Sequence, residues 1–436
     1  MKVRQLALRT LMRMQSSAGY SNLTLDAVIK SDPGVSDPRD RALLTSLVMG
    51  VVQRQTTLDY YIDHLLATGT QPEPEVRMAL RLGLYQLMYL DRIPPHAAVS
   101  ETVDTAPRRA AGLVNAVLRE YLRRGGDIRL PDRSIGGGAA YLAVKYSFPE
   151  VLCRRLLEDY SPDRLESMLD AMSREPELTL RVNTLHTGRE AYLSRLVAAG
   201  YGTARPTELS QTGIRLAGTP IAALPGFDAG DFMVQDEASQ LCVAALDAAP
   251  GMRVLDICSA PGSKGFGAAM YMRNEGHITC FDLHKSKLSL IAGGAARLGI
   301  SIIETAAADG RNFIPELEGV ADRVLCDAPC SGFGVMAKKP EIRHKNPADA
   351  VALPDIQYAI LDNCSRYVAP GGVLVYSTCT VLRCENEGVT DRFLAGHPDF
   401  SPEPFELGGE TVPGRILLAP DTHGTDGFYI AKMRRR

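Results

Sequence analysis

The feature that most constrains the fold is an alternation of short apolar runs with helical segments that begins after Gly251. Each apolar run has the length of a strand, and parallel strands need a crossover connection that is usually a helix. The pattern therefore predicts βαβ units and a doubly wound, Rossmann-like α/β sheet in the C-terminal part of the chain. The predicted strands are residues 253–258, 278–281, 301–306, 323–326, 372–377 and 427–432, and the predicted helices are residues 262–272 and 286–298.

The N-terminal part has a different pattern. From Val3 to about Arg124 the apolar residues recur at helical spacing, as at Leu44, Leu47 and Val48. Proline should end several of these helices, because it lacks a backbone donor and restricts the residue before it. We therefore expect an all-α bundle. The breaks fall at residues 31–34, 71–74 and 93–95.

A chain of 436 residues is long enough for several domains. A glycine-rich polar stretch after the helical part predicts a linker, and the mixed helical and short apolar segments beyond it predict a small α+β connecting domain. We expect an all-α bundle at 1–126, a linker at 127–140, the connecting domain at 141–232 and the Rossmann-like domain at 233–436.

Composition excludes several classes of protein. The sequence has no apolar run near the roughly 20 residues of a membrane-spanning helix, and it does not begin like a secretory signal. The 9 cysteines are irregularly spaced, which argues against a disulfide framework and against a zinc site. A net charge of -3 leaves any nucleic-acid binding to local patches. We expect a cytoplasmic monomer that binds neither a membrane nor a metal.

A loop rich in small residues follows the first predicted strand. Small residues let the backbone turn tightly, and the helix after the loop can present free amides to a ligand. The loop lacks the glycine spacing of a dinucleotide-binding turn and the order of a phosphate-binding loop. We expect it to bind a cofactor through Cys258, Ser259, Ala260, Pro261, Gly262, Ser263 and Lys264.

Acidic residues follow the next strands at the same expected edge of the sheet. Asp282 is placed to accept hydrogen bonds from ribose hydroxyls, and Asp309 could bind an adenine amino group. A ribose and an adenine without a phosphate are features of S-adenosylmethionine, which we expect as the cofactor. For either residue alone, a turn or helix-capping role is the competing interpretation.

Two cysteines also come after strand ends. Cys330 ends the turn Asp327-Ala328-Pro329-Cys330, and Cys379 ends Ser377-Thr378-Cys379. Ligands of open α/β sheets bind at the carboxyl ends of the strands, so both thiols should face one crevice. The cysteines expected inside strands or helices, at positions 153, 242, 280, 326 and 364, should be buried and inert. Cys384 lies neither in such an element nor directly after a strand end.

A pair of thiols fits the methylation of cytosine at C5. This carbon is a poor nucleophile until a thiolate adds to C6, which divides one difficult step into two easier ones. Asp327 could hydrogen-bond the amino edge or N3 of the ring and stabilise the charge that develops. The residues alone do not decide which thiol attacks.

At these residues the chain resembles the RsmB/Sun family of ribosomal RNA cytosine-C5 methyltransferases, within the Nop2/Sun group. The resemblance covers nearly the whole chain and includes an N-terminal NusB-type RNA-binding domain. The motifs that carry it outside the thiol and cofactor loops are 40–43, 47–51, 80–87, 112–119, 180–183, 234–239, 339–343 and 426–429.

The resemblance implies roles for these residues. Cys379 is the thiolate that attacks C6, and Cys330 helps to release the methylated product. The loop from Cys258 to Lys264 binds S-adenosylmethionine, with Asp282, Asp309 and Asp327 as further contacts. The NusB-type domain implies small-subunit (16S) ribosomal RNA as the substrate and binding partner.

The chain departs from the family pattern at several positions. Arg383 and Cys384 replace a proline and a glutamate before Glu385-Asn386-Glu387, and His344 stands where tryptophan is common. Ser259 and Ser263 replace an alanine and a glycine in the cofactor loop. These changes bear on substrate contacts rather than on the reaction.

RNA should be held through its phosphates by basic side chains, while the base is read in the pocket. The target should be unpaired or flipped out, because a base inside a helix cannot be reached. The alternatives are another RNA (transfer RNA or large-subunit ribosomal RNA), methylation of DNA or of an exocyclic amine, and a non-catalytic NusB-like RNA-binding factor. Candidate phosphate contacts are Lys338, Lys339, Arg343, His344, Lys345, Arg108, Arg109, Arg119, Arg123 and Arg124.

Overall fold

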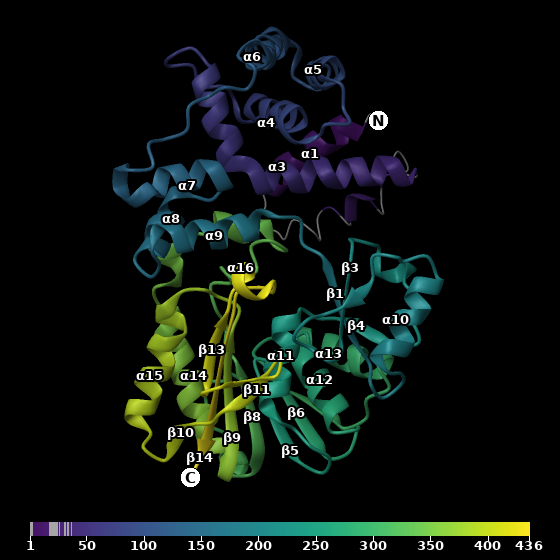
Figure 1. Cartoon of the computed structure of the whole chain (residues 1–436), viewed down its shortest axis with the longest axis vertical. Coiled ribbons are helices and arrows are strands. Elements are labelled where there is room, and N and C mark those ends of the chain that lie inside the picture. The colour runs from purple at the N-terminus through teal and green to yellow at the C-terminus, as the bar shows by residue number, and fades with distance from the viewer. Residues whose placement is uncertain (1–2, 17–24, 26, 30–31, 33–34, 36) are drawn as a thin grey trace. The chain divides into compact units, whose positions relative to one another are not determined.

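The computed structural model describes residues 3–16, 25, 27–29, 32, 35 and 37–436 (Figure 1). The chain forms two compact units. Unit 1 comprises Met1–Ser173 and Met336–Pro347, and unit 2 comprises Arg174–Val335 and Ala348–Arg436. The helix break expected at residues 31–34 lies, except for Asp32, outside the described residues.

The first part of unit 1 is helical, as predicted. Proline occupies the first positions of α3, α4 and α5, and the Asp37 side chain caps α3 by accepting a hydrogen bond from the Arg39 amide (2.8 Å). Leucine and valine side chains from these helices form one apolar core. The helices are α1 (Val3–Ser16), α3 (Pro38–Leu65), α4 (Pro74–Tyr89), α5 (Pro95–Val103), α6 (Ala111–Arg123), α7 (Ala139–Tyr146), α8 (Glu150–Leu157) and α9 (Pro162–Ser173).

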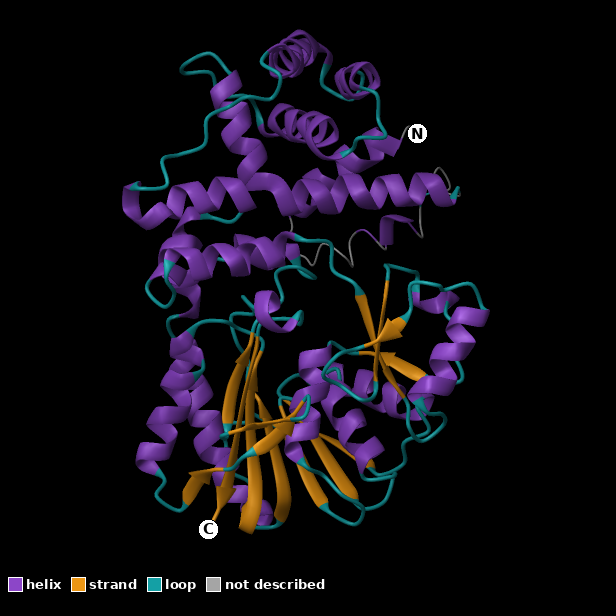
Figure 2. Ribbon diagram, viewed as in Figure 1, coloured by secondary structure: helices purple, strands orange, loops and turns teal. Residues whose placement is uncertain are grey.

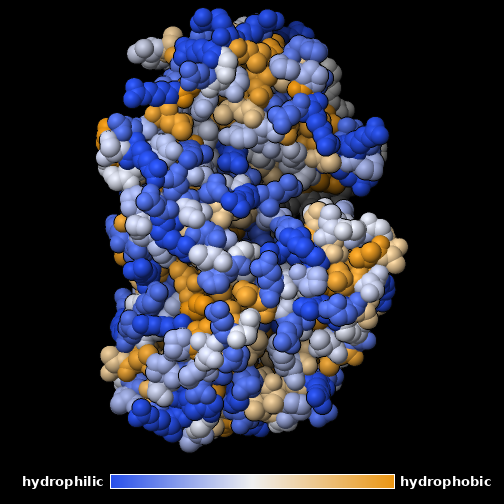
Figure 3. All heavy atoms as spheres, in the orientation of Figure 1, coloured by the Kyte–Doolittle hydropathy of each residue, from blue (hydrophilic) through white to orange (hydrophobic). Residues whose placement is uncertain are grey.

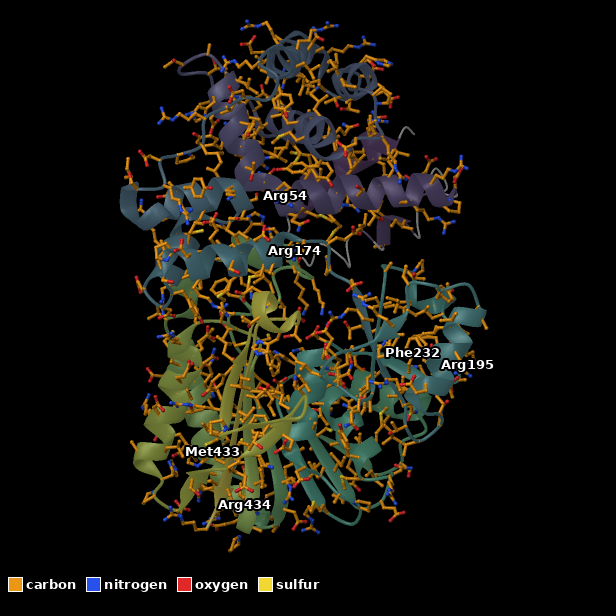
Figure 4. All side chains as sticks on the ribbon, viewed as in Figure 1. Arg54, Arg174, Arg195, Phe232, Met433 and Arg434 are labelled. Atoms are coloured by element: carbon orange, nitrogen blue, oxygen red, sulfur yellow. The ribbon has the colours of Figure 1, made fainter. Side chains whose placement is uncertain are left out.

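Unit 2 begins with a small antiparallel sheet of strand order β2-β3-β1-β4. Its core lies between the sheet and α10 and includes Phe232 (Figure 4), whose ring lies 5.5 Å from the ring of Tyr192. Of the region expected to be α+β, residues 141–232, this packing involves the part after Ser173, whereas residues 141–173 form helices of unit 1. Its elements are β1 (Leu178–Val182), α10 (Arg189–Ala198), β2 (Arg205–Pro206), β3 (Gly213–Leu216) and β4 (Phe232–Val234).

An 8-stranded sheet forms the rest of unit 2, with the order β10-β14-β9-β8-β5-β6-β7 and with β13 paired to β14. The strands from β9 to β7 are parallel, whereas β14 runs antiparallel to β9. The expected doubly wound sheet is confirmed. Its strands are β5 (Arg253–Ile257), β6 (His277–Asp282), β7 (Ile303–Ala307), β8 (Ala321–Asp327), β9 (Val368–Thr378), β10 (Phe400–Pro402), β13 (Arg415–Leu418) and β14 (Phe428–Arg435).

Apolar clusters cover both faces of this sheet. Val375 belongs to the cluster that includes α11, α12 and α13, whereas its neighbour Leu374 belongs to the cluster that includes α14 and α15. Successive side chains of a strand point to opposite faces, so a strand buried on both faces is a continuous apolar run. The helices are α11 (Glu237–Leu246), α12 (Ser263–Tyr271), α13 (Lys285–Arg297), α14 (Leu353–Tyr367) and α15 (Glu387–Gly396) (Figure 2).

The surface is mostly hydrophilic on the face shown in Figure 3, with hydrophobic residues gathered in smaller areas. No helix in the described part of the chain has both the length and the apolar character needed to cross a membrane.

Arg343 lies in the segment of the β8–α14 connection that folds into unit 1, and it is fully buried. Its guanidinium donates to the carbonyl oxygens of Met172 (2.7 Å) and Gln53 (3.2 Å) and lies 4.2 Å from the centre of the Phe148 ring. Burial lowers the pKa of Arg343. The expectation that Arg343 contacts RNA phosphates is therefore wrong, because the side chain satisfies carbonyl groups inside unit 1.

We predict that Arg343→Met lowers the free energy of unfolding by about 1–3 kcal/mol, because buried carbonyl oxygens lose their donor. Urea denaturation measures this change. The exposed Lys339, from the same segment, provides the control, and Lys339→Met should change stability by less than about 0.5 kcal/mol. Unchanged stability together with weaker RNA binding in Arg343→Met would restore the phosphate-contact interpretation.

Candidate active site

The loop after β5 folds into a tight turn against β6. Ser259 donates its amide hydrogen to the Phe281 carbonyl (2.8 Å), and Gly262 donates to the Ser259 carbonyl (2.7 Å). Gly262 has φ of 100°, and a Cβ at this position would lie 2.6 Å from the Phe266 ring. Only glycine suits this turn, which brings the backbone of the expected cofactor loop to the carboxyl end of the sheet.

Asp256, inside β5, is a residue that the sequence analysis missed. Its carboxylate accepts a hydrogen bond from the Ser259 hydroxyl (2.7 Å) beneath the loop. Burial raises the pKa of Asp256 to about 7. Its position inside an apolar strand was the available signal, because a buried carboxyl group needs a partner.

Asp282 lies at the end of β6 and is 7% exposed. Its two carboxylate oxygens accept hydrogen bonds from the amides of Ala260 (3.2 Å) and His284 (2.9 Å). The carboxylate therefore fixes the loop after β5 to the turn after β6. This contact gives Asp282 a turn-forming role, the interpretation that competed with ribose binding.

Asp309 follows β7 in a similar turn. Its carboxylate accepts hydrogen bonds from the Arg311 amide (3.0 Å) and from the Arg311 guanidinium (2.6 Å). Hydrogen bonds from Arg311 lower the pKa of Asp309 to about 2. The Ala308 amide donates to the Asp282 carbonyl (3.1 Å), so the two predicted cofactor aspartates lie on adjoining strand ends.

Lys264 and Asp327 form an ion pair that joins the expected cofactor loop to the end of β8. The Lys264 Nζ lies 2.6 Å from Asp327 Oδ2, and the Ser377 hydroxyl donates to Asp327 Oδ1 (2.7 Å). Burial opposes the charge of Lys264, but the charge and hydrogen bond of Asp327, together with the neighbouring Cys242 and Cys379 thiols, raise the Lys264 pKa. Lys264 therefore belongs as much to the Asp327 site as to the loop in which it was predicted.

The two predicted thiols lie in contact. Cys330 Sγ and Cys379 Sγ are 3.3 Å apart, and both residues are partly exposed. The contact with Cys379 and burial together raise the pKa of the Cys330 thiol. The five cysteines expected to be structural are buried, as predicted, and Cys384 is exposed.

The thiol loops rest on a buried polar network that the sequence analysis did not identify. Glu385 is fully buried, and its carboxylate accepts hydrogen bonds from the amide (2.9 Å) and hydroxyl (2.6 Å) of Ser331 and from the Gln357 side chain (2.8 Å). Asn386 donates to the Thr380 carbonyl (3.0 Å). The available signal was the polar sequence Glu385-Asn386-Glu387, which remains from the family pattern after the replaced positions Arg383 and Cys384.

Within the described residues, the structure contains no group of three or more His, Cys, Asp or Glu side chains that could hold a metal ion. The polar groups at this edge of the sheet are instead carboxylates, an ammonium group and thiols.

Comparison with family models matches three parts of the chain. Residues 243–434 match the 16S rRNA methyltransferase RsmB/F model, and residues 1–123 match the NusB family. Residues 148–222 match the ferredoxin-like domain of RsmF/B-like methyltransferases.

Full-length relatives are also similar. A Bacillus subtilis (strain 168) protein named "Probable ribosomal RNA small subunit methyltransferase B" is 38% identical, with 100% of this chain and 99% of the relative covered. The Pseudomonas putida ribosomal RNA small subunit methyltransferase B is 36% identical, with 99% and 98% covered.

Solved structures agree. The crystal structure of PH0851 has a TM-score of 0.79 and 26% identity, covering 100% of this chain and 98% of that chain. A methyltransferase homologue from Pyrococcus horikoshii has a TM-score of 0.59 and 28% identity, covering 68% and 98%. The fold and the strand-end site define a Rossmann-like methyltransferase. The chain belongs to the RsmB/F family of 16S rRNA methyltransferases, as its resemblance to the RsmB/Sun family implied.

Gly334 provides a test of the thiol geometry. Its amide donates to the Cys379 carbonyl (2.9 Å), and a Cβ at this position would lie 1.8 Å from the Gly427 carbonyl oxygen. We predict that Gly334→Ala lowers the free energy of unfolding by about 1–3 kcal/mol, because the backbone at Gly334 or Gly427 must move to make room for the added Cβ. Chemical denaturation measures this change.

Gly293, on the exposed side of α13, is the matched control because a Cβ there meets nothing within 4 Å. Gly293→Ala should stabilise the helix by about 0.5–1 kcal/mol. If Gly334→Ala is as stable as Gly293→Ala, the close approach at Gly334 is not a constraint on the fold.

Proposed function

We propose that the protein transfers a methyl group from S-adenosylmethionine to C5 of a cytosine in small-subunit ribosomal RNA. The observation that carries the proposal is the contact of the Cys330 and Cys379 thiols (3.3 Å) after the ends of β8 and β9, where Asp327 forms its ion pair with Lys264 of α12. The relatives named as ribosomal RNA small subunit methyltransferase B support the choice of RNA.

The residues at the strand ends fit S-adenosylmethionine. The turn at Gly262 exposes backbone at the edge of the sheet without a side chain in the way, and Asp282 places a carboxylate beside it. Carboxylates at this position accept hydrogen bonds from ribose hydroxyls in doubly wound sheets. The Asp309 carboxylate supplies a further hydrogen-bond acceptor, although the Arg311 guanidinium already donates to one of its oxygens. S-adenosylmethionine, when bound, supplies the methyl group.

Cys379 is the proposed nucleophile. Its sulfur forms a bond to C6 of the cytosine, and the electron pair of the C5–C6 double bond then makes C5 able to accept the methyl group. A base then takes the C5 proton, the C5–H electron pair re-forms the C5–C6 double bond, and the Cys379–C6 bond breaks with its electron pair returning to the Cys379 sulfur. Cys330, in contact with the same sulfur, is placed to assist this last step. The choice of Cys379 rather than Cys330 as the attacking thiol follows the resemblance to the RsmB/Sun family.

Asp327 is proposed to hold the base. Lys264 and Ser377 fix one oxygen each of its carboxylate, so the side chain is oriented before a substrate binds. An oriented carboxylate can accept a hydrogen bond from the amino group of cytosine or from a protonated N3. The neighbouring ammonium group of Lys264 stabilises negative charge that develops on the ring.

Basic residues of unit 1 are proposed to hold RNA phosphates. Arg108, Arg109, Arg119, Arg123 and Arg124 are all exposed. Arg109 pairs with Glu73, while Arg123 and Arg124 both pair with Glu120. Exposed ion pairs contribute little to stability, so phosphates can replace these carboxylates at small cost.

We predict that wild-type protein forms labelled 5-methylcytidine in unmodified small-subunit ribosomal RNA, whereas Cys379→Ala forms none, because no thiolate can add to C6. Nucleoside mass spectrometry with methyl-labelled S-adenosylmethionine measures this product. Cys330→Ala should instead accumulate a covalent protein–RNA adduct, visible on a denaturing gel, because elimination stalls.

Cys384→Ala is the control, since this exposed thiol has no proposed role and its loss should leave methylation unchanged. A Cys330→Ala protein that forms no adduct and no product would reverse or remove the proposed roles. If label appears only in transfer RNA or large-subunit RNA, that RNA is the substrate instead. If no RNA is labelled although the cofactor binds, the result favours a non-catalytic RNA-binding protein.

We predict that Asp282→Asn raises the Kd for S-adenosylmethionine about 10- to 100-fold, the effect of losing charge-assisted hydrogen bonds of about 1.5–3 kcal/mol. Isothermal titration calorimetry measures the Kd. Asp322→Asn is a matched control, because Asp322 also accepts a backbone hydrogen bond (from Arg253, 2.8 Å) but at the amino end of β8. Equal loss of RNA and cofactor affinity in Asp282→Asn would contradict a ribose contact.

A further inference from the structure

We propose that Glu385 is a positioning residue that holds the Cys330 and Cys379 thiols side by side, an inference that rests on the proposed roles of these thiols. Strand pairing between β8 and β9 ends at Asp327 and Ser377. Both cysteines come after that point, so ladder hydrogen bonds do not fix their separation. Contacts beyond the strand ends must do so.

The Glu385 carboxylate connects the residues that directly follow the two cysteines. Ser331, after Cys330, donates its amide to Oε2 (2.9 Å) and its hydroxyl to Oε1 (2.6 Å). Thr380, after Cys379, lies 3.3 Å from Oε1 through its hydroxyl, and the Ser331 and Thr380 hydroxyls are 2.7 Å apart. One carboxylate therefore joins both thiol loops.

The carboxylate is itself held from several sides. The Tyr376 hydroxyl donates to the Glu385 carbonyl (2.7 Å), which ties its backbone to β9. The Gln357 side chain donates both to Glu385 Oε2 (2.8 Å) and to the Pro329 carbonyl (2.9 Å). Gln357, in α14, thus contacts the Cys330 loop before the cysteine at Pro329 and, through Glu385, after the cysteine at Ser331.

The chemistry of the site favours a carboxylate at this position. Its partners at Ser331, Gln357 and Thr380 are all hydrogen-bond donors, and a carboxylate accepts on both oxygens. A glutamine would turn an amide N–H toward the Ser331 and Thr380 hydroxyls, which would then have to accept from it and would lose their own hydrogen bonds to the carboxylate. A buried charge is costly unless it is fully hydrogen-bonded, so Glu385 is placed where its loss opens the connection between the loops.

The separation of the two thiols matters because both are proposed to act on the same cytosine ring. Cys379 must reach C6, and Cys330 must assist release of the product from the same adduct. Substrate binding depends on other residues, so loss of Glu385 should lower the rate of the chemical step and leave the binding of RNA and cofactor intact. A displacement of about 1 Å can cost about 100-fold in rate.

The experiment compares wild-type protein with Glu385→Gln. We expect kcat to fall about 100-fold while KM for RNA and for S-adenosylmethionine stays unchanged. A second readout measures thiol proximity without activity: phenylarsine oxide bridges two adjacent thiols with release of water, and mass spectrometry of the digested protein identifies the bridged cysteines. Wild-type protein should yield a Cys330–Cys379 bridge, and Glu385→Gln should lose most of it.

Glu237→Gln is the matched control. Glu237 is also fully buried in unit 2, and it accepts hydrogen bonds from the amides of Leu209 (2.6 Å) and Ser210 (2.8 Å), away from the thiol loops. It should retain both kcat and the arsenic bridge even where its melting temperature falls. If Glu385→Gln fails to fold, Ser331→Ala removes one contact of the same network and should weaken bridging in the same direction.

Wild-type bridging and kcat in Glu385→Gln would overturn the positioning role. A parallel rise in both KM values with unchanged bridging would also overturn it, since that result describes a substrate contact. If wild-type protein methylates no RNA but loses its bridge on substitution of Glu385, the proposed function fails while the positioning role stands.

Discussion

The proposed active site of unit 2 depends on the parallel pairing of β8 with β9. Because the register places Asp327 beside Ser377, the residues after each strand emerge next to one another. The Ala328 amide donates to the Ser377 carbonyl (3.0 Å), and the Gly334 amide donates to the Cys379 carbonyl (2.9 Å), which extend the connection past the strand ends. A slip of one residue in this pairing would turn every later side chain of the strand to the opposite face and separate the thiols.

Buried charges in this chain are stabilised in different ways. Lys264 and Asp327 neutralise each other, with Nζ 2.6 Å from Oδ2. Arg343 in unit 1 and Glu385 in unit 2 instead rely on neutral groups, with carbonyl oxygens around the first and donors around the second. Breaking either set leaves a buried group unsatisfied, which is why both residues are sensitive positions although neither is proposed to touch substrate.

Periodicity and chain order made much of the fold and part of the site predictable from the sequence. The alternation after Gly251 determines the sheet, and the rule that ligands bind at the carboxyl ends of strands brought Asp282, Asp309, Cys330 and Cys379 to one edge. The β11 (Phe405–Leu407) and β12 (Glu410–Val412) hairpin was not predicted, because three-residue strands leave no periodic signal. The use of Glu385 was not predicted either, since its donors come from separate segments and converge only after folding.

Arg343 shows a second limit of prediction from the sequence, which concerns the direction in which a loop folds. A basic run next to the proposed catalytic turn predicts phosphate contacts on charge alone, but side-chain charge does not reveal which way a loop folds. Here residues 336–347 fold into unit 1, and Arg343 binds helix carbonyls inside it. Exposure separates Lys339 from Arg343 although their residue types are similar in charge.

The β8–α14 connection explains why the thiol loops need hydrogen bonds of their own to hold them against the sheet. The chain that leaves β8 carries Cys330 and Ser331 and then continues into the segment that belongs to unit 1. Any displacement of that segment would pass back along the chain to Cys330 unless an intervening residue were fixed to the sheet. Ser331, held by Glu385, and Gly334, held by the Cys379 carbonyl, are such residues. All these contacts lie within unit 2, so the spacing of the two sulfurs proposed to react depends on residues of that unit.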